Sequence, residues 1–419
     1  MYDSIVLGSG VVGVNTAYWL AKSGHKVLVI DRQPEVGNEA SYANGGLVSV
    51  GHAEPLANPK APFQILKWLL QDDAPLLFRP QADPHQWRWL FSWLWQCSKK
   101  NHTHNTIDII RLATYSRELL QQVREEHQLD YRHRTRGLLQ FYRNRDEFES
   151  AKPTVDLMQQ FGCNRHIIDK ETALTIEPAL RWSAHDIIGA TYTENDESGD
   201  AHQYTQELAQ VCRDMGVEFA MNTHILGLVQ EGKKIQVRVN GDLGNTHMTA
   251  ENIAVCMGSW SAPLLRPLGI YLNIYPSKGY SITVPIEHPD SAPFVSLTDD
   301  EHRLVYSRLG DELRVAGTAE IGGYSREMNA KRCDRIVQRA REMFPEAGGF
   351  SQARFWSGLR PSTPSNLPYI KKTQFDNLWL NTGHGNLGWT MGCGSGKYLA
   401  DLVSLGEQAE FNQFQLISS

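Results

Sequence analysis

The first thirty-two residues constrain the fold more strongly than any other stretch of the chain. Residues 2–7, which are apolar at positions 5–7, predict a short strand, and the turn Gly8-Ser9-Gly10-Val11-Val12-Gly13 follows it directly. Good helix formers without proline occupy residues 14–22, and residues 26–30 predict a second buried strand that ends in Asp31. This succession of strand, G-x-G-x-x-G turn, helix, strand and acidic residue is typical of a unit that binds a dinucleotide.

The three glycines and the acid have distinct physical tasks in such a unit. Gly8 permits a tight turn, Gly10 lets the backbone approach a pyrophosphate, and Gly13 lets the helix pack closely on the strand. The N-terminus of the helix presents unpaired N–H groups and the positive end of its dipole to the phosphates. Asp31 stands 18 residues after Gly13, where a carboxylate can accept hydrogen bonds from a ribose. The sequence therefore predicts a dinucleotide site; a coincidental glycine-rich turn is the alternative.

Length, charge and cysteine usage narrow the class of protein. A chain of 419 residues is too long for one simple core, so we expect two domains. A net charge of −6 argues against nucleic acid as a partner. The six cysteines are scattered without a C-x-x-C pair, which fits a reducing compartment and predicts neither a metal site nor a disulfide framework.

The hydropathy of the chain bears on its location. The first strand begins too early for a signal peptide, and no apolar run approaches the roughly 18 residues that span a bilayer. We therefore expect a cytoplasmic protein, with peripheral attachment to the inner face of the cell membrane left open.

Small residues gather after the second predicted strand. The stretch Ala40-Ser41-Tyr42-Ala43-Asn44-Gly45-Gly46-Leu47-Val48 contains paired glycines, which bring backbone close to a bulky, flat group. Beside the opening motif we interpret it as contact with the second half of the cofactor; a plain loop is the alternative. His52 follows shortly and is a candidate for a substrate pocket, although a lone histidine is more often structural.

Four tryptophans lie within residues 86–95. On a helix, one apolar face would be shared by Trp87, Leu90, Phe91, Leu94 and Trp95. Trp89 and Trp93 would lie off that face. We predict a helix buried in the second domain; the alternative is a helix that lies at a membrane surface through residues 87–95, because tryptophan is favourable there.

The pattern of strands changes in the second half of the chain. Residues 253–257 predict a buried strand that runs into Gly258, at the carboxyl end where ligands collect in open α/β sheets. From residue 269 to 317, short alternating segments separated by turn signals predict an antiparallel sheet. Because such a sheet differs in kind from the opening unit, it indicates a second domain.

Two stretches near the C-terminus carry further candidates. Arg360 stands in a turn defined by a glycine before it and a proline after it, and its planar guanidinium can bind a carboxylate through two parallel hydrogen bonds. A salt bridge to an acid of the protein itself is an equal alternative. Residues 378–381 predict a strand, which is followed by the glycine-rich stretch 383–390 and a helix over 391–405. This arrangement again presents helix N–H groups to negative charge.

Taken together, these stretches resemble the D-amino acid oxidase superfamily of FAD enzymes and, within it, the bacterial dehydrogenases of D-amino acids (small-subunit type). The stretches that carry the resemblance are residues 6–14 (VLGSGVVGV), 43–45 (ANG), 275–281 (YPSKGYS), 355–361 (FWSGLRP) and 381–391 (NTGHGNLGWTM). The likeness runs from end to end of the chain, and the last two stretches are the most specific.

The resemblance implies FAD as the cofactor. The ADP half would bind at the opening turn, the flavin along residues 41–47, and the pyrimidine end of the flavin at residues 383–390. Ile225 would meet the adenine through its backbone, while Gly258 and Trp260 would close over the phosphates. The residues expected to bind FAD are Gly8, Gly10, Val11, Val12, Gly13, Asp31, Arg32, Ser41, Ala43, Asn44, Gly45, Gly46, Leu47, Ile225, Gly258, Trp260, Gly358, Gly383, His384, Gly385, Asn386, Leu387, Gly388 and Thr390.

The resemblance also implies a reaction, the oxidative deamination of small D-amino acids to 2-oxo acids and ammonia. Arg360 would bind the substrate carboxylate, Tyr280 would line the pocket, and His52 completes the set of catalytic candidates; no metal is expected. Electrons would pass to a quinone or another respiratory-chain acceptor. The alternatives are an oxygen-using oxidase of amines or imino acids such as D-hydroxyproline or glycine, a nicotinamide-dependent dehydrogenase, and a non-catalytic flavin-binding module.

The expected fold class is α/β, or α+β overall, with a Rossmann-like FAD-binding domain and a second, antiparallel β-sheet substrate domain. We expect residues 1–85, 150–268 and 355–419 to form the FAD-binding domain. Residues 86–149 and 269–354 would form the substrate domain.

Overall fold

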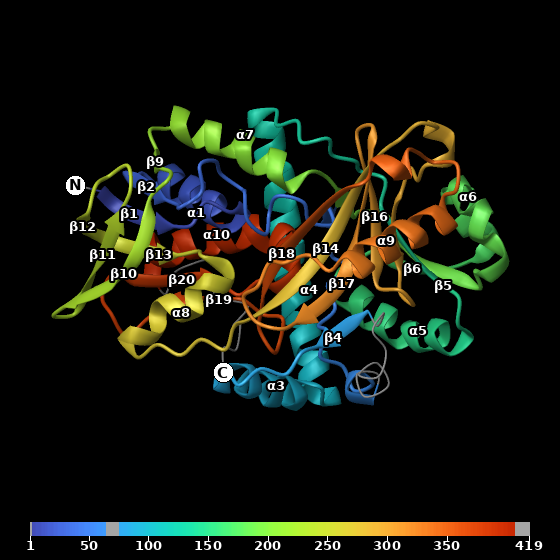
Figure 1. Cartoon of the computed structure of the whole chain (residues 1–419), viewed down its shortest axis with the longest axis horizontal. Helices are drawn as coiled ribbons and strands as arrows, with labels where there is room; N and C mark the ends of the chain where they lie inside the picture. Colours follow the sequence, from blue (N-terminus) through green and yellow to red (C-terminus); the bar gives the residue numbers. More distant parts are fainter. Residues whose placement is uncertain (1, 64–74, 407–419) are drawn as a thin grey trace.

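Two large sheets lie side by side in the protein (Figure 1). The computed structural model describes residues 2–63 and 75–406. Within them, one sheet has six strands and the other nine, and two smaller sheets are attached. The mixed α/β fold class predicted from the sequence is confirmed.

The first sheet is built mainly from parallel strands. Its order is β19 (Tyr369–Lys372), β20 (Leu378–Thr382), β13 (Ala250–Val255), β1 (Tyr2–Leu7), β2 (Val27–Ile30) and β9 (Glu218–Ala220). Only β19 runs antiparallel to its neighbour. The central strands are apolar and buried, as expected for a parallel sheet that is covered on both faces.

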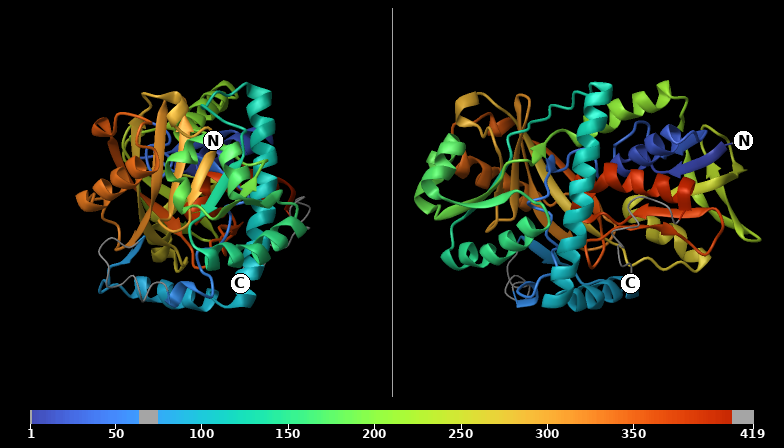
Figure 2. Two further views of the ribbon diagram at one scale, coloured as in Figure 1. Left: turned by 90° about the vertical axis from the view of Figure 1, so that its right-hand side faces the viewer. Right: turned by 180° about the vertical axis from the view of Figure 1, so that it is seen from behind.

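Helices with small residues cover this sheet. They are α1 (Val11–Lys22), α7 (Ala201–Asp214), α8 (Ser261–Leu265) and α10 (Gly388–Leu405). Helices α1 and α10 approach closely, because a Cβ atom at Gly396 would lie 2.8 Å from the backbone of Asn15. The long helix α4 (Lys99–His127) crosses behind both halves of the molecule (Figure 2). It contacts α10 through Ser116, whose Oγ accepts a hydrogen bond from the Gly394 N–H at 2.9 Å.

The second sheet is mostly antiparallel. Its order is β18 (Arg354–Ser362), β14 (Tyr275–Pro285), β17 (Glu312–Ile321), β16 (Leu304–Leu309), β15 (Ser296–Asp299), β5 (Leu138–Tyr142), β7 (Gly189–Thr193) and β6 (Arg165–Asp169), with β4 (Leu76–Phe78) beside β17. The pairs β15–β5 and β17–β4 are parallel. Helices α5 (Arg145–Gln160), α6 (Lys170–Ile176) and α9 (Ala330–Met343) belong to this half (Figure 1).

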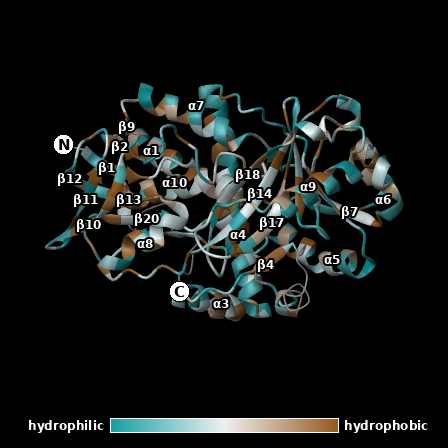
Figure 3. Cartoon of the chain, in the orientation of Figure 1, coloured by the Kyte–Doolittle hydropathy of each residue, from teal (hydrophilic) through white to brown (hydrophobic). Residues whose placement is uncertain are grey.

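The remaining strands are short or peripheral. Strands β10 (His224–Glu231), β11 (Lys234–Asn240) and β12 (Thr246–Met248) form a small antiparallel sheet, and β3 (Leu47–Val48) pairs with β8 (Glu197–Ser198). Figure 3 shows hydrophobic residues on the central strand β13 and mainly hydrophilic ones on the peripheral helices α6 and α7. The apolar cores therefore follow the two large sheets.

The two large sheets do not follow the domain ranges that we predicted from the sequence. Strands β4, β6, β7 and β18 fall in the segments 1–85, 150–268 and 355–419, yet they pair in the nine-stranded sheet. These segments thus contribute to both halves, and the domain boundaries stay a prediction. Residues 64–74 and 407–419 of the proposed ranges lie outside the described residues.

The tryptophan-rich segment forms a helix, α3 (Pro84–Gln96), whose buried face was predicted wrongly. Trp89 and Trp93 are 5% and 4% exposed, stack on each other and face the core. Phe91 and Trp95 are 64% and 76% exposed. The helix is therefore not buried throughout, because four of the five residues of its predicted apolar face are exposed and the fifth, Leu90, is only partly buried. Among the described residues, no helix is long and apolar enough to cross a membrane.

Candidate functional site

A cavity of about 1690 Å³ lies between the two large sheets. On one side are the carboxyl ends of β1, β2, β13 and β20, and on the other is a face of the second sheet from β18 to β5. Every site residue predicted from the sequence lines this cavity except Gly13 and Gly383. The opening turn, the loop at 41–47, the start of α10 and the three catalytic candidates are thus brought together.

The opening turn is held by close backbone contacts. Gly8 has φ +104°, and a Cβ atom there would lie 2.7 Å from the carbonyl oxygen of Cys256. A Cβ atom at Gly13 would lie 1.9 Å from the carbonyl oxygen of Gly8, so Gly13 serves helix packing and stays off the cavity wall. Gly383 also has a positive φ, +88°, and a Cβ atom there would lie 2.8 Å from Thr363 Cγ2. The structure gives both of these glycines a packing role.

Asp31 lines the cavity and also fixes the turn. Its Oδ2 accepts hydrogen bonds from the N–H and hydroxyl of Ser9, at 2.7 and 2.9 Å, and its Oδ1 accepts one from Gln33 N–H at 2.9 Å. A carboxylate has about four acceptor positions, so capacity remains for a ribose. Beside it, the Arg32 guanidinium lies 4.7 Å from the ring centre of Trp260, and the pair forms a flat wall of the cavity.

Two helices begin at the cavity without side-chain caps. The N-cap residues Gly10 of α1 and Leu387 of α10 make no side-chain capping hydrogen bond, and neither helix has an acid in its first turn. Ser41 Oγ accepts a hydrogen bond from the Val11 N–H at 3.0 Å. Such helix starts favour anions because their N–H groups and dipoles point at the ligand.

The second sheet anchors the small-residue loop. Three consecutive carbonyl oxygens accept hydrogen bonds: Ala43 from Ser281 Oγ at 2.7 Å, Asn44 from Arg314 Nη1 at 3.1 Å, and Gly45 from Ser307 Oγ at 2.7 Å. The loop is thus fixed between the two halves of the molecule. Sequence reasoning missed the three donors, because they lie on β14, β17 and β16, more than two hundred residues away.

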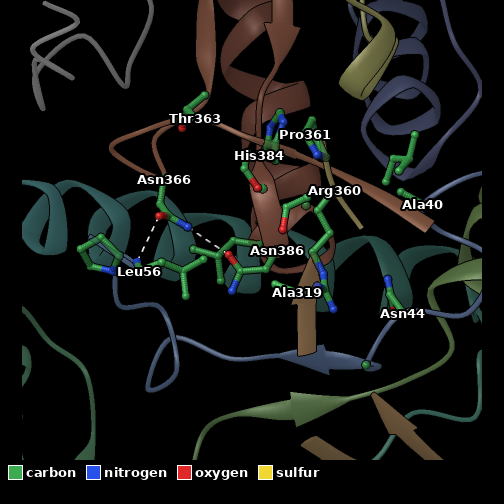
Figure 4. A pocket seen from close by; sticks show the side chains of 18 of the residues that line it. Ala40, Asn44, Leu56, Ala319, Arg360, Pro361, Thr363, Asn366, His384 and Asn386 are labelled. Carbon is green, nitrogen blue, oxygen red and sulfur yellow. Dashed lines mark hydrogen bonds between the residues drawn. The ribbon is translucent and has the colours of Figure 1, made fainter. Parts of the chain in front are cut away.

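Arg360 lies on β18 and faces the cavity without an acidic partner. Its side chain is drawn at the cavity in Figure 4, and its Nη1 donates to the carbonyl oxygen of Thr318 at 2.9 Å. Among the described residues no carboxylate pairs with it, so the alternative of an internal salt bridge is not found. Burial lowers the pKa of Arg360 to about 10. A partly buried cation of this kind is stabilised by an anionic ligand.

A β-bulge shapes the backbone surface against which this guanidinium packs. The β14–β17 register shifts between Lys278 and Tyr280, and Thr318 opposite has φ +51°, which costs a β-branched residue about 1–3 kcal/mol. A Cβ atom at Gly279 would lie 2.2 Å from Arg360 Cζ. The guanidinium therefore rests on bare backbone. No local sequence signal marks Gly279 or Thr318, because the bulge arises from strand pairing.

Tyr280 lines the cavity, but its hydroxyl is occupied. It donates to Glu320 Oε2 at 2.7 Å, and Glu320 also pairs with Arg79 at 2.7 Å and with Lys278 at 3.5 Å. Burial and the hydrogen bond to Glu320 raise the pKa of Tyr280. Tyr280 is therefore a neutral wall residue whose orientation is fixed by a carboxylate.

Two of the histidines that line the cavity, the predicted site residues His52 and His384, are kept neutral. Burial lowers the pKa of His52, and it lowers the pKa of His384 to about 3. The His384 Nε2 is hydrogen-bonded to Ser395 Oγ at 2.9 Å. The loop before His52 is clamped by buried Asp196, which accepts hydrogen bonds from Val50 and Gly51 N–H at 2.9 and 3.0 Å. Neither histidine carries charge near neutral pH.

Comparisons with known proteins agree with this geometry. A family model described as FAD dependent oxidoreductase matches residues 3–402. A D-amino acid dehydrogenase of Dechloromonas aromatica (strain RCB) is 47% identical over 402 residues, which cover 96% of each chain. One of Paramagnetospirillum magneticum is also 47% identical, over 96% of this chain and 94% of its own.

Solved structures show the same fold. Glycine oxidase from Bacillus cereus ATCC 14579 has a TM-score of 0.75 at 23% identity, covering 100% of this chain and 99% of its own. L-Proline dehydrogenase from P. horikoshii has a TM-score of 0.71 at 17% identity, covering 98% and 97%. With the family model spanning nearly the whole chain and two relatives near half identity, the protein belongs to the DAO family of FAD-dependent oxidoreductases.

Proposed function

We propose that this protein is an FAD-dependent D-amino acid dehydrogenase that converts D-amino acids to 2-oxo acids and ammonia. Nearly full-length relatives of this name, at 40–47% identity, support the activity. The single observation that carries the proposal is Arg360, a partly buried guanidinium that faces the cavity and has no carboxylate partner among the residues that the structure describes.

The residues that line the cavity fit FAD. The uncapped start of α1 would hold the pyrophosphate, the wall of Arg32 and Trp260 would flank the ADP half, and the start of α10 would face the pyrimidine end of the flavin. The anchored carbonyls of the loop at 43–45 would leave its other face for the ring. When bound, FAD supplies a hydride acceptor for the substrate Cα–H.

Residues of the second sheet would position the amino acid. Arg360 would bind the carboxylate through two parallel hydrogen bonds, and Tyr280 would form the adjoining wall. Because His52 and His384 stay neutral, neither competes with Arg360 for the carboxylate or repels the substrate ammonium group. Orientation of the substrate is then the main contribution of the protein to the rate.

Replacement of Arg360 by alanine tests this function. The variant Arg360→Ala should keep its flavin absorbance while kcat/KM for D-amino acids, measured with a dye acceptor, falls at least about 100-fold, because a charge-assisted bidentate bond is lost. The matched control is Arg354→Ala on the same strand, whose side chain is 70% exposed. Unaltered kinetics in Arg360→Ala, or a wild-type flavin that no D-amino acid bleaches anaerobically, would contradict the proposal.

We further propose a quinone or another membrane carrier as the electron acceptor, with the outer face of α3 as a peripheral membrane contact. The exposed Phe91 and Trp95 support this contact, since aromatic side chains are favourable at a bilayer interface. The double variant Phe91→Ser/Trp95→Ser should lose flotation with liposomes of bacterial lipid while it keeps its dye-linked activity. Peroxide formation at the rate of turnover would instead indicate an oxidase.

A further inference from the structure

The cavity extends beyond the proposed FAD and substrate positions into a region with apolar walls. The cavity has a volume of about 1690 Å³, and its lining includes six apolar side chains that no proposed FAD or substrate contact uses. We call this region the apolar arm; its walls are formed by Leu56, Leu76, Phe78, Trp87, Leu90 and Leu94. These residues come from the loop after His52, from β4 and from α3.

The apolar arm adjoins the catalytic centre through direct contacts. Leu76 of β4 pairs with Ala319, which follows the Thr318 carbonyl that holds Arg360. On the other side, Leu56 N–H donates to Asn366 Oδ1 at 3.1 Å, and Asn366 Nδ2 donates to Asn386 Oδ1 at 3.0 Å (Figure 4). Asn386 lies just before α10, where the flavin ring is proposed. The arm therefore leads to the ring.

The side chains of helix α3 face three different surroundings: the core, the cavity and the outer surface. Trp89 and Trp93 anchor it, and Trp89 Nε1 donates to the carbonyl oxygen of Ser362 on β18 at 2.8 Å. Leu90 and Leu94 line the cavity. Phe91 and Trp95, which face outward, are not part of the cavity lining. One helix thus connects an apolar outer surface with an apolar passage to the catalytic centre.

We propose that the apolar arm binds the ring and first isoprenoid unit of a lipid-soluble quinone and guides it to the flavin. This inference rests on the proposed function. The amino acid gives up its Cα–H and one N–H hydrogen to become an iminium ion, and two electrons and two protons convert the quinone to the quinol. Water then hydrolyses the iminium ion to the 2-oxo acid and ammonium.

The chemistry of the walls favours a quinone over the amino acid as occupant. A zwitterionic amino acid that lay against these leucine and aromatic side chains would lose part of the hydration of its charges. A quinone ring with an isoprenoid tail gains about 25 cal/mol for each Å² of apolar surface that leaves water. The exposed aromatic face of α3 lies beside the arm, so the passage lies next to the proposed lipid surface.

The test uses the flavin-loaded protein and ubiquinone-1 as the probe. In the variant Leu90→Gln/Leu94→Gln, the Kd for ubiquinone-1, measured by quenching of tryptophan fluorescence without amino acid, should rise at least tenfold. The KM for ubiquinone-1 should rise in parallel, whereas kcat/KM for the D-amino acid with a phenazine dye should stay within twofold. The matched control is Leu243→Gln, an exposed leucine that is absent from the cavity lining.

A second variant guards against misfolding of the first. Leu56→Gln alters the opposite wall at a side chain that is 47% exposed, and it should also weaken ubiquinone-1 binding. Unchanged ubiquinone-1 binding in both variants overturns the inference. An equal loss of dye-linked kcat/KM also overturns it, because the arm would then be the route of the amino acid. If D-amino acids fail to bleach the wild-type flavin, the proposed function is refuted. The inference about the apolar arm is then judged by ubiquinone-1 binding alone.

Discussion

Arg360 lies flat against the backbone of Gly279, and this contact explains why a glycine is needed there. The nearest guanidinium atoms would lie 2.2–2.4 Å from a Cβ atom at position 279. The carbonyl oxygen of Thr318 fixes the same guanidinium from the neighbouring strand. The absence of a Cβ atom at Gly279 thus sets the position of the Arg360 charge, which is proposed to bind the substrate.

Gly279→Ala should therefore raise the KM for D-amino acids at least tenfold, with a smaller effect on kcat and an unchanged flavin spectrum. The added methyl group displaces the guanidinium, and a small displacement weakens a bidentate bond strongly. Steady-state kinetics with a dye acceptor measures the split. Gly227→Ala is the control, because the nearest atom to its Cβ is Arg238 Nη2 at 4.0 Å. Equal KM values in the two variants would show that Arg360 does not depend on Gly279.

The sequence identified those cavity residues whose positions follow from local geometry. Gly8 and Asp31 could be predicted because a turn between a strand and a helix imposes their spacing. Arg360 was marked by a glycine and a proline around it. Thr318 and Gly279 could not be found, because a bulge depends on how two strands pair and not on either strand alone.

At the scale of elements, the loop at 43–45 is a bridge between the two large sheets. Its carbonyl oxygens are turned toward the second sheet, where Ser281, Arg314 and Ser307 donate to them. The flavin contact proposed for this loop therefore depends on side chains of the half that is proposed to bind the substrate.

Ser281→Ala/Ser307→Ala should weaken FAD binding roughly tenfold or more, because two hydrogen bonds of about 1 kcal/mol each are lost. Titration of the flavin-free protein with FAD, followed by flavin fluorescence, measures the Kd. The exposed Ser351→Ala serves as the control. A Kd equal to that of the wild type would mean that the loop keeps its conformation without these donors.

Periodicity located helix α3 correctly and assigned its faces wrongly. A count of apolar positions favoured the side with five large residues, but Trp89 and Trp93 form the buried side. Helix α3 packs against β14 and β18 on the side of these two stacked rings. There, Trp89 donates a hydrogen bond to Ser362. A pattern of hydropathy cannot distinguish a core from an outward apolar face when both are present.

At the scale of the whole molecule, the two sheets share strands from distant segments. Alternation predicted the antiparallel strands between residues 269 and 317, and the opening motif predicted the parallel sheet. The membership of β6 and β7 in the second sheet was not predictable, because it depends on the pairing of β7 with β5 and β6 and not on any one of these segments alone.

All six cysteines are buried and free, so the folded protein should be inert to thiol reagents. Burial raises the pKa of Cys97 to about 11 and that of Cys212 to about 12, and a thiol reacts as its thiolate. Titration with Ellman's reagent should detect less than one thiol in the native state and six after denaturation in guanidinium chloride. Fast reaction of a native thiol would show that a buried region opens readily.

The turn at residues 8–13 and the start of α10 at Gly388 both border the proposed FAD site. Only β13 separates their strands, β1 and β20, although some 370 residues lie between them in the chain. During synthesis on the ribosome the first half of the site emerges early and the second half almost last. We therefore expect cofactor capture to come late in biogenesis, because a nascent chain halted before residue 388 lacks one of the two helix starts that are proposed to bind the flavin.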